Sequence, residues 1–261
     1  MKTAEQASEQ SPNGLSADFS KLVIDASTAI TQADPVVIID GKPAVRKGDL
    51  VVVVGEKCSG KSNLASLLAA ACISPTPVGG SLRVPNGLKM IVFDTEQSDR
   101  SISRRLHRAI DTAGARASHT DCGAFIYVRL RDGGAETRRA AIERFCKALK
   151  PDIVYIDGLA PLFDDFGDES VDKTADILAA LSRDRQCAVF ITLFARSYAL
   201  RMIKDRLIPL TDIVMFLTRE HADDGIVFRV VARDRDHENT SLSFRVVDDG
   251  GRYEILQAST E

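Results

Sequence analysis

The sequence predicts an α/β fold in which helices cover a mostly parallel sheet and antiparallel hairpins extend that sheet near the C-terminus. Two observations predict it. Between residues 50 and 193, β-branched runs alternate with helical segments, which is typical of parallel strands joined by helices. After residue 210, β-rich runs follow one another with only turn sequences between them, which is typical of hairpins.

The parallel part of the sheet is predicted from five runs rich in valine, isoleucine or phenylalanine. In chain order, the expected strands are Leu50 to Val54, Met90 to Asp94, Phe125 to Arg129, Ile153 to Asp157 and Ala188 to Leu193. The expected helices are Lys61 to about Cys72, Asp99 to Ala113, Ala135 to Leu149 and Ser170 to Arg183. Because helices separate most of these strands, neighbouring strands are expected to be parallel.

The C-terminal hairpins are predicted from the runs DIVMFLTRE, GIVFRVVAR, LSFRVV and RYEIL, which are expected to be short strands. The sequences HADDG, DRDHENT and DDGG separate them and are rich in turn-forming residues. Connections of this length join antiparallel neighbours, so we expect these strands to extend one edge of the sheet.

Length and composition bound the possible classes of protein. The chain has 261 residues, 44% hydrophobic and 27% charged, which is enough for one large domain. Residues 1–20 are polar and are expected to be a flexible tail, which leaves 21–261 as the folded domain. The net charge of −3 excludes a surface that is basic overall. Five widely spaced cysteines, no C-x-x-C pair and no apolar run of roughly 20 residues predict a soluble cytoplasmic protein without a membrane partner.

The stretch GEKCSGKS, residues 55–62, fits the phosphate-loop pattern G-x-x-x-x-G-K-[ST] between a strand and a helix. Gly55 and Gly60 permit a tight turn whose N–H groups point inward, and the helix adds the positive end of its dipole. Lys61 is expected to reach the β- and γ-phosphates and Ser62 to ligate Mg²⁺. The expected nucleotide-binding residues are Gly55, Glu56, Lys57, Cys58, Ser59, Gly60, Lys61, Ser62 and Asn63. The alternative is a glycine turn that binds nothing.

Two acidic residues follow apolar strands, at the edge of the sheet where ligands gather. Asp157 ends the run IVYID and is expected to hold Mg²⁺, although an apolar run that ends in Asp is often only a strand that meets a turn. Glu96 follows the run MIVFD and is expected to orient and polarise the water that attacks the γ-phosphate. The alternative for Asp94 and Glu96 is that they only cap the helix that opens at Ser98.

Together, the segments GDLVVVVGEKCSGKS, IVFDTEQS and VYIDGLAPL resemble those of the RecA-like P-loop ATPases, and in particular the RepA-type hexameric helicases and related ATPases of mobile elements. The resemblance runs from about Val36 to Phe244. It implies a three-layer fold, ATP and Mg²⁺ as ligands, and a hexamer-like ring of identical subunits that acts on DNA. It also implies that Glu96 activates water and that Arg233 and Arg235 complete a neighbouring subunit's site as arginine fingers, against the alternative of a solvated hairpin edge.

The chain departs from this family at the end of the strand AVFITL. The family usually places a polar sensor of the γ-phosphate there, whereas this chain has Leu193 and Phe194, which cannot hydrogen-bond a phosphate through their side chains. Thr192 and Ser197 are two alternative polar groups for this role, and neither is assigned to it. This departure keeps a second hypothesis open, a nucleotide-gated binding module with little hydrolysis. A small-molecule kinase is a third and weaker one, because no basic lid segment is evident.

Two basic segments have open interpretations. Residues 196–206, RSYALRMIKDR, combine positive charge with an aromatic ring, which suits single-stranded DNA in a ring channel but equally suits an amphipathic helix with solvated charges. A second cluster, Arg100, Arg104, Arg105 and Arg108, has helical spacing and is expected to be a solvated stripe.

Overall fold

The computed structural model describes residues 32–114, 124–165, 167–195, 207–223, 225–234, 239–247 and 251–256. The chain divides into two units, residues 1–33 and 34–261, and all the described helices and strands belong to the second unit. Within the described ranges, every helix is too short or too polar to span a lipid bilayer.

A nine-stranded sheet forms the centre of residues 34–261, with the order β12-β11-β10-β9-β3-β8-β7-β5-β6. Its parallel strands are β3 (Leu50–Gly55), β5 (Met90–Asp94), β6 (Phe125–Arg129), β7 (Ile153–Asp157) and β8 (Ala188–Phe194). All five pair in parallel with their neighbours, as the sequence predicts. The carboxyl ends of β3, β5 and β7 therefore meet at one edge of the sheet, and this edge holds the candidate site.

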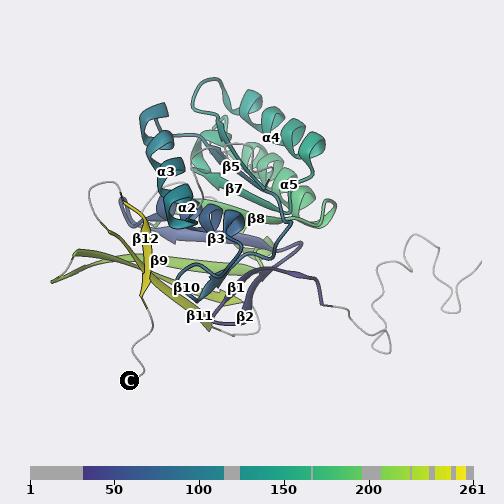
Figure 1. The fold of residues 1–261 in the computed structure, drawn as a ribbon. Coiled ribbons are helices and arrows are strands. Elements are labelled where there is room, and N and C mark those ends of the chain that lie inside the picture. Colours follow the sequence, from purple (N-terminus) through teal and green to yellow (C-terminus); the bar gives the residue numbers. More distant parts are fainter. Residues whose placement is uncertain are drawn as a thin grey trace, which may run out of the picture. The chain divides into compact units, whose positions relative to one another are not determined.

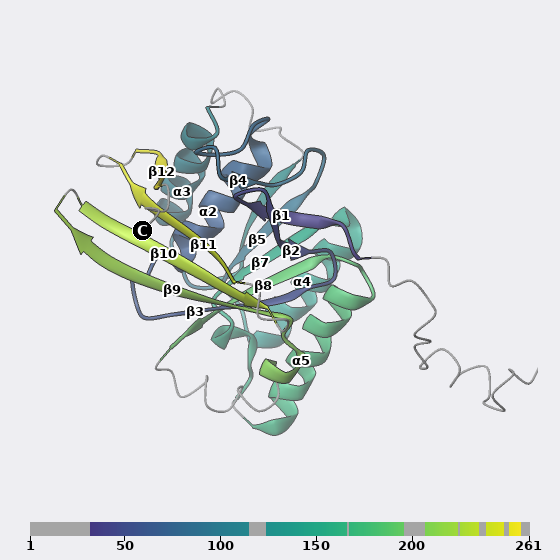
Figure 2. The same cartoon turned by 90° about the horizontal axis from the view of Figure 1, so that it is seen from below.

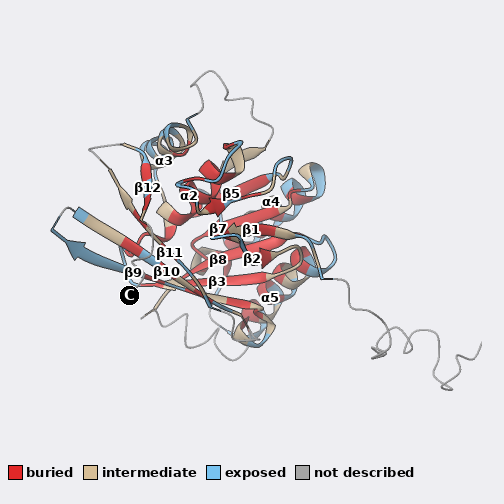
Figure 3. Cartoon of the chain, turned by 60° about the horizontal axis from the view of Figure 1, so that its bottom comes forward, coloured by how far each residue is buried: buried red, intermediate tan, exposed pale blue. Residues whose placement is uncertain are grey.

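Two helices cover each face of this sheet and give three layers (Figure 1). The helices are α2 (Lys61–Ile73), α3 (Asp99–Thr112), α4 (Ala135–Leu149) and α5 (Asp168–Arg183). The residues of β3 alternate between the faces: Val51 and Val53 pack in the cluster that contains α2, whereas Leu50 and Val52 pack in the cluster that contains α5. Because β3, β5, β7 and β8 are buried on both faces, their residues form the continuous apolar runs seen in the sequence (Figure 3).

The C-terminal strands extend the sheet from β3. They are β9 (Ile213–Ala222), β10 (Gly225–Asp234), β11 (Asn239–Val246) and β12 (Tyr253–Leu256). β9 joins β3 in parallel, and the remaining three pair antiparallel in sequence, as predicted. The prediction that all of these strands are short is wrong for β9 and β10, which have 10 residues each and extend beyond the helices (Figure 2). Ladder pairing continues through His221 and Ala222, which the sequence assigns to the turn, although their side chains are exposed.

A separate three-stranded sheet, with the order β2-β1-β4, was not predicted. Its strands are β1 (Pro35–Ile39), β2 (Lys42–Arg46) and β4 (Leu82–Arg83). Asp40 and Gly41 both have positive φ, 49° and 77°, and they form the tight turn between β1 and β2. An Asp-Gly pair between two β-rich runs is a recognised hairpin signal, so the sequence did contain the information.

One carboxylate on the edge of the sheet opposite the site gives a prediction about stability. Burial raises the pKa of half-buried Asp49 from 3.8 to about 6, and the charges of Asp212 and Asp234 add to the shift. The folded state therefore binds more protons than the unfolded state between about pH 4 and 6, and stability falls as the pH rises through this window. Asp49→Asn keeps an acceptor for the Arg46 amide, which Asp49 Oδ2 binds at 2.7 Å.

We therefore expect Asp49→Asn to raise the free energy of unfolding by about 1–2 kcal/mol at pH 7, after allowance for partial exposure. The gain should shrink towards pH 4, where the wild-type carboxyl is protonated in the folded state. Urea unfolding at the two pH values measures both differences. A variant that is less stable than wild type at pH 7 would contradict the prediction.

Candidate functional site

The loop between β3 and α2 has a shape that requires its glycines. Gly60, directly before α2, has a φ of 97°, and a Cβ there would lie 2.4 Å from Cδ1 of Phe228. A Cβ on Gly55 would lie 2.3 Å from the Ser59 hydroxyl. Both distances are shorter than non-bonded atoms tolerate, so side chains are excluded at both ends of the loop.

Lys61 is the first residue of α2, and its side chain folds back over the loop. Its ammonium donates hydrogen bonds to the carbonyl oxygens of Gly55 and Glu56, both at 2.8 Å, and lies 4.4 Å from the ring centroid of Phe194. Burial lowers the pKa of Lys61, while the charges of Asp157 and Glu96 oppose that shift. The buried Tyr155 hydroxyl donates to the Lys61 carbonyl oxygen at 2.7 Å and anchors the start of the helix.

Asp157 ends β7 and is buried beneath the loop. Its Oδ1 accepts a hydrogen bond from the Thr192 hydroxyl at 3.2 Å. Its Oδ2 is buried and has no partner in hydrogen-bond geometry among the described residues, although the nearby Ser62 hydroxyl helps to lower the pKa of this carboxyl. Burial, followed by the charge of Asp94, outweighs these contacts, so the pKa of Asp157 is raised. The positive charges and hydrogen-bond donors around this carboxylate therefore do not offset the cost of burying its negative charge.

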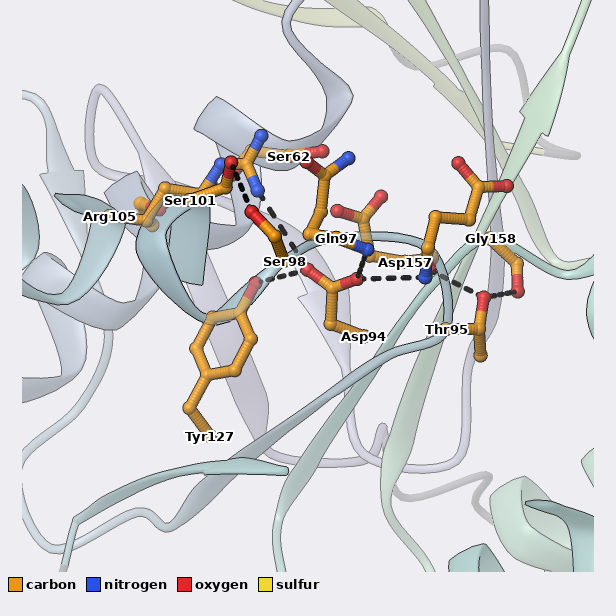
Figure 4. Close-up of polar contacts among 12 residues, drawn as sticks. Ser62, Asp94, Thr95, Gln97, Ser98, Ser101, Arg105, Tyr127, Asp157 and Gly158 are labelled. Carbon is orange, nitrogen blue, oxygen red and sulfur yellow. Dashed lines mark hydrogen bonds and ion pairs between the residues drawn. The ribbon is translucent and has the colours of Figure 1, made fainter. Parts of the chain in front are cut away.

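Glu96 lies two residues after β5, beside Asp157. Burial raises the pKa of Glu96, the charges of Asp157 and Asp94 add to this shift, and Lys61 opposes it. The adjacent Thr95 hydroxyl donates to the carbonyl oxygens of Asp157 and Gly158, at 3.1 and 2.8 Å, and ties the end of β5 to that of β7 (Figure 4). Two acidic side chains from adjacent strands thus face the same space.

That space is a pocket of about 380 Å³ beside the loop. Its lining comes from the loop, α2, α3 and the ends of β5, β7 and β8. The lining residues are Lys57, Cys58, Ser59, Gly60, Lys61, Ser62, Asn63, Glu96, Gln97, Arg105, Asp157, Thr192 and Phe194. A glycine-bounded loop, a buried lysine and two carboxylates therefore surround one cavity, an arrangement suited to binding the phosphates of a nucleotide.

The pocket also fits Mg²⁺. Among the described residues, no group of three Cys, His or acidic side chains lies close enough to hold a metal on its own. Mg²⁺ in nucleotide sites needs no such group, because one or two protein oxygens and the substrate phosphates suffice. The unpartnered Oδ2 of Asp157 and the Ser62 hydroxyl beside it supply oxygens of that kind.

Comparison with known proteins agrees with this geometry. A sequence model described as "AAA domain" matches residues 16–195. The chain belongs to the AAA domain family. No curated protein has a matching sequence.

The family match and the solved structures together give this AAA domain the fold of the RecA-like P-loop ATPases. The flagellar accessory protein FlaH of Methanocaldococcus jannaschii aligns with a TM-score of 0.59 and 14% identity, over 83% of this chain and 92% of FlaH. A KaiC-like protein of Pyrococcus horikoshii aligns with a TM-score of 0.56 and 14% identity, over 84% and 94%. At this identity the likeness concerns the fold alone. The RepA-type branch stays a prediction.

Some predicted site residues of this AAA domain lie elsewhere. Arg233 is exposed on β10, opposite Val214, which pairs with Val52 and not with the loop end of β3. It therefore lies away from the nucleotide pocket of its own chain, over the exposed ring of Phe216. Arg235 and residues 196–206 lie outside the described residues.

The structure separates the two apolar residues at the sensor position. Leu193 is buried in the core that contains α5, whereas Phe194 faces the pocket over Lys61. Thr192, two residues before Phe194, supplies the polar group of β8, because its hydroxyl contacts Asp157 and accepts a hydrogen bond from the Gly158 amide at 2.8 Å. Alternation along a strand, which puts residues 192 and 194 on one face, was the signal available in the sequence.

Sequence reasoning also missed Arg105. It was expected to belong to a solvated stripe, but its side chain is only 16% exposed, lines the pocket and lies 3.8 Å from Asp94. The prediction is wrong here because the rotation of α3 on the sheet, set by Ile102 and Ala109 on its buried face, turns this arginine inward.

Proposed function

We propose that this AAA domain binds ATP with Mg²⁺ and hydrolyses it. The observation that carries the proposal is the convergence of Lys61, Glu96 and Asp157 on one pocket beside the phosphate loop. The loop amides and Lys61 would hold the triphosphate, Ser62 and Asp157 would hold Mg²⁺, and Glu96 would orient the attacking water and accept its proton. Bound Mg²⁺ would supply charge neutralisation at the phosphates.

Removing the Lys61 charge tests this proposal. Lys61→Met keeps a flexible apolar side chain beneath Phe194 but loses the ammonium that would reach the phosphates. We expect ATP turnover to fall at least about 100-fold, because a charged contact to the transferring phosphoryl group is lost. A phosphate-release assay measures the rate, with Lys42→Met on the exposed part of β2 as a control. Equal turnover by wild type and Lys61→Met would contradict the proposal.

A binding module with little hydrolysis is the second candidate, and Phe194 favours it. The ring stands over the Lys61 ammonium at a position where this chain lacks a polar sensor of the γ-phosphate. The two candidates differ in wild-type behaviour. Calorimetric uptake of ATP with Mg²⁺ but negligible turnover, with or without single-stranded DNA, would support the binding module and contradict the hydrolase.

We further propose that the protein forms a hexamer-like ring and acts on DNA in the replication or mobilisation of a plasmid or mobile element. The likeness of the three motifs to RepA-type helicases supports this, together with the basic composition of residues 196–206. Arg233 and Arg235 would then act on the site of a neighbouring subunit, and the exposure of Arg233 is compatible with that role. Light scattering with and without a nonhydrolysable ATP analogue tests assembly, and a persistent monomer would remove the role of both arginines.

A further inference from the structure

We propose that Asp94 is a positioning residue that fixes the direction of Glu96 for hydrolysis. This inference rests on the proposed ATPase function. The sequence offers helix capping as an alternative role for Asp94. The structure places Asp94 at the centre of a polar cluster, in which Tyr127 donates a hydrogen bond to it and Arg105 forms an ion pair with it (Figure 4).

The turn that carries Glu96 is built on the Asp94 side chain. Asp94 Oδ1 accepts hydrogen bonds from the backbone amides of Glu96 and Gln97, at 3.0 and 2.8 Å. These bonds hold the backbone on both sides of the Glu96 Cα atom, so they set the direction in which its side chain leaves the chain. Asp94 acts on Glu96 through the main chain.

One residue of the neighbouring strand β6 and one residue of α3 contact the Asp94 side chain. Its Oδ2 accepts a hydrogen bond from the Tyr127 hydroxyl on β6 at 2.9 Å, and Arg105 Nη1 lies 3.8 Å from the same oxygen. The Asp94 side chain is fully buried. A buried carboxylate with contacts on both oxygens has little freedom to rotate. Asp94 therefore fixes the turn at Glu96 and Gln97 to the neighbouring strand of the sheet.

The same contacts exclude a direct chemical role for Asp94. Both of its oxygens are engaged, and it is not among the residues that line the nucleotide pocket. A general base or a metal ligand needs a free oxygen facing the substrate. Glu96, in contrast, lines the pocket.

Glu96 is confined from the opposite side as well. Gly158, after β7, has a φ of 99°, and a Cβ there would lie 2.8 Å from Glu96 Oε1. The Glu96 side chain therefore passes directly over this glycine. The turn held by Asp94 and the space left by Gly158 together leave Glu96 a narrow range of directions, which a water-orienting group requires.

Three variants test the inference. Asp94→Ala removes every contact, and we expect kcat to fall about 10- to 100-fold because the Glu96 carboxylate is misplaced by a fraction of an ångström or more. ATP affinity should stay within about threefold, because the loop and Lys61 are untouched. Asp94→Asn keeps one oxygen for the two amides and should recover part of the rate. Tyr127→Phe removes one anchor and should lower kcat about threefold to tenfold.

A double-mutant cycle separates positioning from general damage. In a Glu96→Gln background, the inference requires that Asp94→Ala lower kcat no further. A further loss would show that Asp94 also acts through Arg105, which lines the pocket, and would overturn the inference. The matched control is Asp152→Asn at the opposite ends of β5 and β7, where Asp152 accepts the Lys89 amide at 2.9 Å and pairs with Lys47 at 2.8 Å. Loss of its charge should affect stability and leave kcat unchanged.

The outcomes divide cleanly. Loss of kcat without loss of affinity, partial recovery in Asp94→Asn, and no further loss in the double variant support the inference. Full activity in a folded Asp94→Ala protein would overturn it, as would Asp94→Asn rates no higher than those of Asp94→Ala. If Asp94→Ala does not fold, unchanged kcat in Tyr127→Phe overturns it. An inactive wild type is a separate result, which contradicts the ATPase function itself.

Discussion

Glu96→Gln is expected to lower ATP turnover by about 10²- to 10⁴-fold, the range that general bases contribute, while nucleotide binding is retained. The amide has nearly the shape of the carboxylate but cannot accept a proton from water. In the part of the chain that the structure describes, no hydrogen bond is found between Glu96 and Lys61, Ser62 or Asn63, which line the same pocket. Binding and hydrolysis should therefore separate in this variant.

The measurement pairs steady-state phosphate release with titration of a fluorescent ATP analogue in the presence of Mg²⁺. Asp99→Asn is the matched control, because Asp99 is an exposed acid three residues along the chain that pairs with Arg129 at 3.2 Å and does not line the pocket. It should leave both the rate and the affinity unchanged. Turnover by Glu96→Gln at the wild-type rate would mean that another group orients the water, and Asp157, the other carboxylate in the pocket lining, would be the next candidate.

The parallel core and the position of the site were predictable because both depend on local sequence. A buried parallel strand has to be apolar along its length, so IVYID and MIVFD identify β7 and β5 almost to the residue. Since parallel strands end at the same edge, the residues that follow them must lie near the phosphate loop. The register pair Asp94 and Asp157 shows this directly.

Other features depend on tertiary packing and escaped prediction. Arg104 and Arg105 belong to the same predicted basic cluster, but Arg104 is exposed and Arg105 is mostly buried. Only the packing of α3 against the sheet decides which of the two side chains points inward. The anchor Tyr127 is distant in sequence from Asp94, and the pair forms only because β6 lies beside β5. The exposed ends of β9 and β10 remain in the ladder through main-chain pairing, which side-chain polarity does not show.

Gly60→Ala is expected to have the largest effect on stability among single changes in the loop. Alanine at this position would have to adopt a φ of 97°, which L-residues rarely do. Its methyl group would also lie 2.4 Å from Cδ1 of the Phe228 ring. Phe228 cannot move easily, because it is buried and stacked on Phe244 with ring centroids 5.3 Å apart. We expect the free energy of unfolding to fall by about 2–4 kcal/mol, with loss of nucleotide binding.

Gly80→Ala is the matched control for the free-energy cost of placing alanine at a positive φ. Gly80 has a φ of 78°, and no atom lies within 4 Å of the added Cβ. It should lose only about 1 kcal/mol. Gly60→Ala combined with Phe228→Leu should regain part of the stability lost to the clash, whereas the backbone strain would remain and nucleotide binding would stay weak. Urea unfolding and nucleotide titration of the variants give both quantities. If Gly60→Ala is no less stable than Gly80→Ala, contact between the loop and Phe228 does not constrain the site.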